Sequence, residues 1–121
     1  MPESKLQIAE HQVEDVVVLT LSGQILLDDG DLAFRRQIHD LIGRGHKKIV
    51  VDLGGVSYID SSGLGMILAK LKTVRDAGGD MKLVHVTGKT QRLLAMVRLV
   101  SMFEVFEDHA SAVRSFTWKA S

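Results

Sequence analysis

The sequence contains no cysteine among its 121 residues, which excludes both a disulfide framework and a site built on thiolates. It carries no net charge, because 15 lysines and arginines balance 15 aspartates and glutamates. A neutral chain has no bulk attraction for nucleic acid or for an anionic membrane. The stretch MPESKLQIAE at the start lacks the apolar core of a signal peptide, and no apolar run is long enough to span a bilayer. We therefore expect a cytoplasmic protein that binds neither nucleic acid directly nor a membrane.

The composition that remains is that of an ordinary globular domain. Hydrophobic residues make up 45% of the chain and charged residues 25%, which suits a single core at this length. No repeat, low-complexity tract or linker divides the sequence. We expect one domain that covers residues 1–121.

Apolar periodicity predicts alternating strands and helices. Strands are expected around Leu6–His11, around Val16–Leu21 and over 47–53, 80–86 and 103–106. Helices are expected over 31–45, over 62–77 with a stop at Gly78-Gly79, over a segment that includes 93–100, and after Asp108 as N-cap. The first two strands can pair antiparallel, while strands joined through helices should be parallel. The predicted fold is an α/β domain with a mixed sheet covered by helices.

Motifs for enzymatic chemistry are missing. The segment GKT at 88–90 resembles the end of a phosphate-binding loop, but Leu83 stands where that motif requires glycine. The serines at 61 and 62 lack the leading glycine of a nucleophile elbow. The histidines are His11, His39, His46, His85 and His109. No two of them have metal-ligand spacing on a helix, so we expect scattered histidines and no metal site. Because the catalytic and phosphate-binding motifs are incomplete, we also expect no cofactor and no enzymatic activity.

The stretch SYIDSSGLGMIL, residues 57–68, places an acid, two serines and two glycines between a predicted strand and a predicted helix. Asp60 and Ser61 are both good N-cap residues, so capping is one explanation. Capping leaves the second hydroxyl and both glycines unexplained, and each glycine costs a helix about 1 kcal/mol relative to alanine. Small residues at a helix start let a partner approach closely. A hydroxyl there can accept a phosphoryl group, which adds about −1.5 to −2 charge and which a helix N-terminus tolerates. The pattern favours a binding surface that phosphorylation switches off.

The segment VVDLGGVSYIDSSGLGMILAKLKTVRDAGGDMKLVHV, followed by RLLAMVRLVSMFEVFED, resembles the anti-sigma factor antagonists, the stand-alone STAS-domain proteins of bacteria. The resemblance spans nearly the whole chain and implies the STAS fold, a mixed β-sheet with helices packed against it. In that family the protein binds an anti-sigma factor that is also a serine kinase, and binding releases the sigma factor. Phosphorylation of the serine after the aspartate abolishes binding, and a dedicated phosphatase resets the switch.

The resemblance implies roles for individual residues by position. Ser61, directly after Asp60, would be the phosphorylated residue. The kinase would supply ATP and the catalytic base, so no catalysis is required of this chain. The partner-binding residues would be Asp60, Ser61, Ser62, Gly63, Gly65, Met66, Lys70 and Thr73. Met66, Lys70 and Thr73 are expected to form an exposed flank of the helix, beside a buried stripe of Leu64, Ile67, Leu68, Leu71 and Val74.

The sequence departs from the family pattern after the second predicted strand. In GQILLDDGD, Leu26 stands where many family members have an acid that helps to recognise the partner, and Asp28 or Asp29 could substitute for it. This departure leaves the identity of the partner open.

A second hypothesis is a constitutive STAS scaffold subunit, as in stress-sensing assemblies or lipid-transport accessory proteins, in which Ser61 is only a cap. A third is a small enzyme or nucleotide-binding domain that uses Ser61 or the GKT segment.

Overall fold

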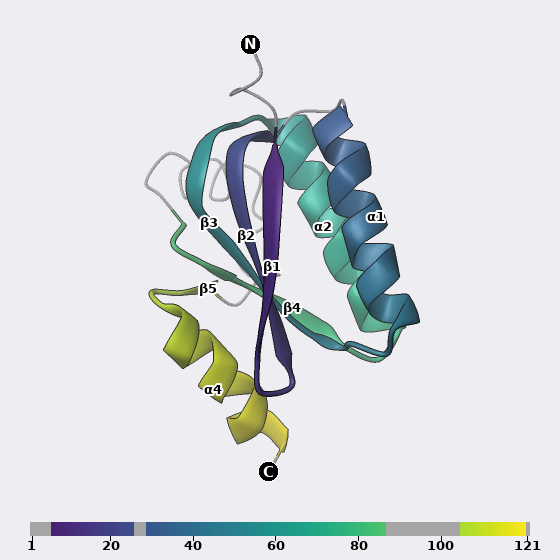
Figure 1. Ribbon diagram of the computed structural model, residues 1–121, viewed down its shortest axis with the longest axis vertical. Helices are drawn as coiled ribbons and strands as arrows, with labels where there is room; N and C mark the ends of the chain where they lie inside the picture. The colour runs from purple at the N-terminus through teal and green to yellow at the C-terminus, as the bar shows by residue number, and fades with distance from the viewer. Residues whose placement is uncertain (1–5, 26–28, 87–104, 121) are drawn as a thin grey trace.

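The computed structural model describes residues 6–25, 29–86 and 105–120 (Figure 1). The elements are β1 (Gln7–Val13), β2 (Val16–Ile25), α1 (Asp29–Gly43), β3 (Lys48–Ile59), α2 (Ser61–Asp76), β4 (Asp80–Val84), β5 (Val105–Phe106) and α4 (His109–Ala120). The strands form one sheet in the order β1-β2-β3-β4-β5. β1 pairs antiparallel with β2, and each later pair of neighbours is parallel. The predicted α/β fold with a mixed sheet is confirmed.

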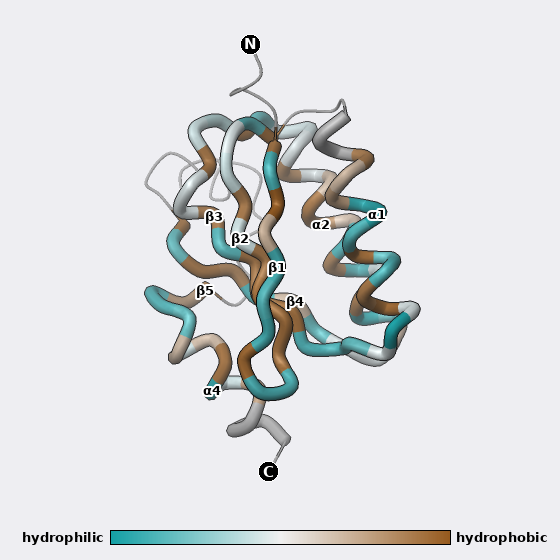
Figure 2. The backbone as a smooth tube through the Cα atoms, in the orientation of Figure 1, coloured by the Kyte–Doolittle hydropathy of each residue, from teal (hydrophilic) through white to brown (hydrophobic). Residues whose placement is uncertain are grey.

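Helices cover both faces of the sheet, with α1 and α2 on one face and α4 on the other (Figure 1). Successive side chains of β2 point to opposite faces, so Leu19 belongs to the core under α1 and α2 while Val18 belongs to a smaller core under α4. Both side chains are fully buried. This arrangement explains why the central strands read as continuous apolar runs. Figure 2 shows the apolar segments concentrated in these strands and hydrophilic residues along much of α1.

β3 continues beyond Leu53, where we expected it to end, and reaches Ile59. Its parallel partner β2 continues as well, so that Ile25 pairs with Ile59 across two irregularities in the register. A glycine helps the two backbones to approach, because a Cβ on Gly55 would lie only 2.9 Å from the carbonyl oxygen of Leu21. The sheet therefore extends to the edge of the serine-rich segment.

α2 begins at Ser61, one residue before the predicted start, and ends at Asp76, with Ala77 as C-cap directly before the predicted glycine pair. Gly78 has φ +90°, in the region that favours glycine. Its N–H donates to the carbonyl of Arg75 at 3.0 Å, and the N–H of Gly79 donates to that of Val74 at 2.9 Å. These two bonds form the motif by which glycine commonly ends a helix.

Several expected features lie outside the described residues. They are the helix over 93–100, the GKT segment at 88–90 and the Leu26–Asp28 part of the departure from the family pattern. Within the part of the chain that the structure describes, no helix has both the length and the apolar character needed to cross a membrane.

Candidate functional site

The serine-rich segment lies at the carboxyl ends of β2 and β3, where the chain enters α2. Ile25 and Ile59 end the two strands as a register pair, and both side chains are buried in the main core. Asp60 follows directly, and Ser61 is the first residue of the helix. Two paired strands therefore fix the position of this helix start.

Asp60 is the N-cap of α2. Its backbone is extended, with φ −104° and ψ 180°, and its Oδ1 accepts a hydrogen bond of 2.7 Å from the N–H of Gly63. The Asp60 carbonyl accepts the first helical bond, 2.9 Å from the N–H of Leu64. Of the two N-cap candidates in the sequence, the structure selects the aspartate, which satisfies one of the free donors of the first turn.

Ser61 and Ser62 are both exposed in the first turn of α2. Neither hydroxyl makes a hydrogen bond to a residue that the structure describes. The first turn itself carries no acidic residue. The exposed serines therefore lie at the positive end of the helix dipole, with only the Asp60 carboxylate close to them in sequence.

The two glycines of the first turns have different surroundings. A Cβ on Gly63 would lie 2.3 Å from the carbonyl oxygen of Ile25 and 2.9 Å from its Cγ2, so only glycine lets α2 start this close to β2. A Cβ on Gly65 would meet nothing within 4 Å, and this residue is exposed. The fold thus requires the first glycine and has no steric need for the second.

The expectation that Met66 is exposed is wrong, since it is 8% exposed and belongs to the main core. Met66 lies three residues after Gly63 and so on the same side of the helix, the side that packs against the end of β2. Lys70 continues this line toward α1, where its Nζ lies 3.4 Å from Nε2 of His39. Both Lys70 and Thr73 are half-buried, and the Thr73 hydroxyl donates to the Ala69 carbonyl at 3.0 Å. The predicted flank therefore turns partly toward α1.

A different flank of α2 is hollowed. A pocket of about 520 Å³ lies along it, lined among others by Gly65, Leu68, Ala69 and Lys72. Leu68, which the apolar periodicity placed in the buried stripe, is only partly buried there. The sequence contains a signal for this flank, a leucine and two small residues at helical spacing. A stripe of apolar residues alone does not distinguish a fully buried leucine from a partly exposed one.

The expectation of scattered histidines is also wrong. His85 Nδ1 lies 3.0 Å from Oδ1 of Asp52, and His109 Nε2 lies 2.7 Å from Oδ2 of the same carboxylate. The rings of His11 and His109 are 5.8 Å apart. Sequence spacing does not predict this cluster, because its members come from β1, from β3, from the position directly after β4 and from the start of α4. It lies on the face of the sheet that α4 covers, opposite α2.

The mixed sheet, its helices on both faces and the capped Asp60-Ser61 helix start define a small α/β domain of the STAS class. The family model described as STAS domain matches residues 7–112, and the chain belongs to that family.

One relative and two solved structures show how close the similarity is. An anti-sigma F factor antagonist of Paenibacillus polymyxa is 31% identical over 109 residues, which cover 89% of this chain and 92% of that protein. The crystal structure of a candidate anti-sigma factor antagonist of Thermotoga maritima has TM-score 0.80 at 28% identity, over 89% of this chain and 92% of that one. The anti-sigma factor antagonist of Mycobacterium paratuberculosis has TM-score 0.80 at 20% identity, over 93% and 94% of the two chains, and shows the shared fold.

Proposed function

We propose that this chain, as a single STAS domain over residues 1–121, is an anti-sigma factor antagonist that works by partner switching. In the unphosphorylated state it binds an anti-sigma factor that is also a serine kinase, and this binding releases a sigma factor. Phosphorylation of Ser61 by the kinase ends the binding, and a phosphatase restores it. The 31% identical relative named as an anti-sigma F factor antagonist supports the general role.

The observation that carries the proposal is that Asp60, and not Ser61, caps the start of α2. Asp60 caps α2 through its bond to the Gly63 N–H, and the exposed Ser61 hydroxyl makes no hydrogen bond to the described part of the chain. A serine that only capped the helix would use its oxygen for that bond. Ser61 is instead free to accept a phosphoryl group from a docked kinase.

Phosphorylation at this place would change the surface more than the fold. The phosphoryl group would lie at the start of α2, where the helix dipole and backbone N–H groups favour negative charge. It would also add a second negative group directly after Asp60, on a surface that is otherwise small and neutral over Ser62 and Gly65. A partner that packs closely on this surface would lose its contact through bulk and charge repulsion.

Gly65 supports a contact surface because its small size has no steric explanation within the described residues. We place the centre of the partner surface at Asp60, Ser61, Ser62 and Gly65. Gly63 is buried beneath this surface against Ile25 and allows the start of α2 to lie close to β2. Lys70 and Thr73 lie at its α1 side, and Met66 supports it from the core. The chain itself needs no catalytic residue for this role.

The test uses wild type, Ser61→Ala, Ser61→Glu and Ala110→Glu as baits in a pull-down from lysate of the native host, with mass spectrometry of the captured proteins. We expect wild type and Ser61→Ala to retain an ATPase-type serine kinase that Ser61→Glu loses. Incubation of the purified pair with ATP should phosphorylate wild type on Ser61 and leave Ser61→Ala unmodified.

Ala110→Glu is the matched control, because Ala110 is exposed in the first turn of α4, on the other face of the sheet. It adds the same charge at a helix start outside the proposed partner surface, so it should retain the partner as wild type does. All variants change exposed residues, so their unfolding free energies should stay within about 0.5 kcal/mol of wild type. If all four baits retain the same proteins, the chain is a constitutive interaction module and the switch is refuted.

A further inference from the structure

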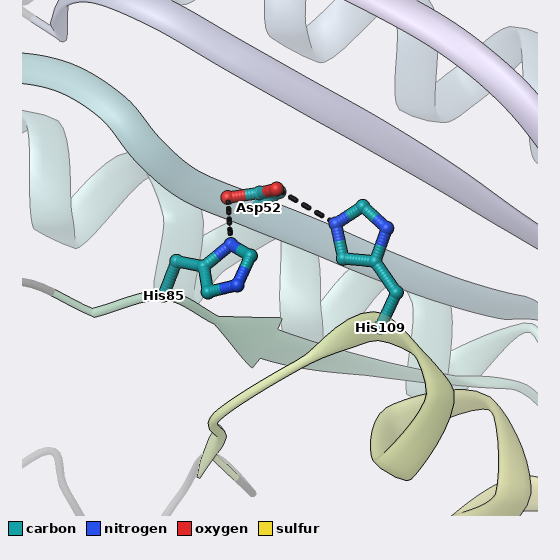
Figure 3. Close-up of side chains that lie close together, drawn as sticks. All are labelled: Asp52, His85 and His109. Atoms are coloured by element: carbon teal, nitrogen blue, oxygen red, sulfur yellow. Dashed lines mark hydrogen bonds and ion pairs between the residues drawn. The ribbon is translucent and has the colours of Figure 1, made fainter.

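A second cluster of polar side chains lies on the face of the sheet that carries α4, away from the serine-rich helix start. Asp52 comes from β3, His85 directly follows β4, and His109 is the first residue of α4 (Figure 3). Both rings point toward the carboxylate, one to each of its oxygens. The three potential ligand atoms, one from each residue, lie within 4.8 Å of one another. Three elements far apart in the sequence therefore present donors to one point.

The carboxylate is held firmly. Asp52 is only 7% exposed, and its Oδ1 also accepts a hydrogen bond of 2.8 Å from the N–H of Gly54. A buried carboxylate placed between two imidazoles is a suitable ligand group for a cation.

The backbone places both histidines for this contact. His85 has φ +56°, a left-handed conformation that is uncommon outside glycine, asparagine and aspartate and that histidine also adopts more often than most residues. His109 is fixed at the start of α4 because Asp108 caps that helix through a 2.7 Å bond from the N–H of Ser111.

A small residue leaves space beside the cluster. A Cβ on Gly54 would lie 3.1 Å from Oδ1 of Asp52 and 3.2 Å from the Cβ of His85. A larger side chain at this position would therefore crowd both donors. The two imidazoles remain open to solvent, with 43% of the His85 side chain and 33% of the His109 side chain exposed, so an ion can reach their nitrogens.

We propose that Asp52, His85 and His109 bind a divalent transition metal ion, with Zn²⁺ as the best match. Two imidazole nitrogens and one carboxylate oxygen are a common three-residue ligand set for zinc, and water can take the fourth position. Tetrahedral zinc with bonds of about 2.0–2.2 Å requires ligand atoms about 3.4 Å apart. The three ligand atoms already lie within 4.8 Å of one another and the two rings are partly exposed, so only a small rearrangement would be needed. The ion would replace the direct hydrogen bonds.

Bound metal would join β3, the end of β4 and the start of α4. The metal would therefore stabilise the packing of α4 against the sheet, and it would not contact the Ser61 surface on the other face. The site would be structural, and it does not depend on the proposed partner switching.

The test is isothermal titration calorimetry of ZnCl₂ into the full chain after treatment with EDTA and removal of the chelator, with MgCl₂ titrated in parallel. We expect one Zn²⁺ per chain and no detectable Mg²⁺ binding, because Mg²⁺ prefers oxygen ligands. Zn²⁺ should also raise the thermal midpoint of the protein, since it binds the folded state.

Two variants remove one ligand each. His85→Asn suits the left-handed backbone and keeps an N–H that can reach Asp52, while it removes the imidazole. His109→Gln likewise keeps a polar group that can reach the carboxylate. Each should weaken Zn²⁺ binding at least about tenfold. The control His46→Gln, on the loop before β3, should bind as wild type does.

Without metal, both variants should show the circular dichroism spectrum of wild type. If one of them does not, the affinity comparison uses the other variant. Wild-type binding weaker than about 1 mM would overturn the proposal. Equal zinc affinity in wild type, His85→Asn and His109→Gln would overturn it as well, because the metal would then be bound elsewhere.

Discussion

Gly63 and Gly65 are two residues apart in the same helix, yet replacing each by alanine should have opposite effects on stability. In Gly63→Ala the added methyl would lie 2.3 Å from the carbonyl oxygen of Ile25, whereas ordinary contacts begin near 3.4 Å. The start of α2 would have to move away from β2 by roughly 1 Å, and a backbone carbonyl in a strand cannot rotate aside as a flexible side chain does. In Gly65→Ala the methyl would enter open space.

The magnitudes follow from these surroundings. Overpacking typically costs about 1–3 kcal/mol, and the rigid neighbour places Gly63→Ala at the upper end. The better helix propensity of alanine returns about 1 kcal/mol, which leaves a net loss of about 2 kcal/mol. Gly65→Ala has the propensity gain without the clash, so it should stabilise the fold by about 0.5–1 kcal/mol. The two variants should therefore differ by about 2.5–3 kcal/mol in unfolding free energy.

Urea denaturation followed by circular dichroism measures this difference directly, provided that the slope of the transition is the same in all three proteins. The midpoint should fall for Gly63→Ala and rise for Gly65→Ala. A Gly63→Ala protein as stable as wild type would refute the close packing of α2 on β2. A destabilised Gly65→Ala protein would show that Gly65 has a structural role, and its place at the centre of the partner surface would lose its main support.

Three further predictions concern single contacts. Asp60→Ala should cost about 1 kcal/mol through loss of the N-cap, while Asp60→Asn should cost much less, in the same denaturation assay. Ile67→Ala should cost about 2–5 kcal/mol because Ile67 is fully buried, and Leu68→Ala, on the open flank, less than half as much. The hydrogen bond from Lys48 lowers the pKa of Asp15, so this pair stabilises the fold above pH 3.8 and loses that effect as the pH falls through the lowered value. Asp15→Asn should accordingly be less stable than wild type at neutral pH and equal to it in strong acid.

The order of strands and helices could be predicted from the sequence because local periodicity determines it. Alternation with period two and apolar stripes with period 3.6 distinguish strands from helices without knowledge of their neighbours. The cap at Asp60 and the stop at Gly78 are local for the same reason, since each depends on a few consecutive backbone groups. The far end of β3 was missed because the residues after Leu53 are glycine, serine and other mostly exposed side chains without an apolar pattern.

The rest depends on contacts between distant segments. The difference between Gly63 and Gly65 depends on where Ile25 ends β2, and the burial of Met66 depends on the same packing. The cluster of Asp52 with two histidines exists because β3, β4 and α4 meet on one face. A spacing rule for one helix cannot find ligands that three separate elements supply.

The sheet separates two hydrophobic cores, a large one under α1 and α2 and a small one under α4. The small core contains few described side chains, among them Ala112, Val113 and Phe116 of α4. Segments with less buried apolar area open at lower free energy and do so as cooperative units. Amide hydrogens of α4 should therefore exchange with solvent through local opening, while those of β2 and β3 exchange only when the whole domain unfolds. An excursion of α4 into an open state would leave α2 and its serines in place.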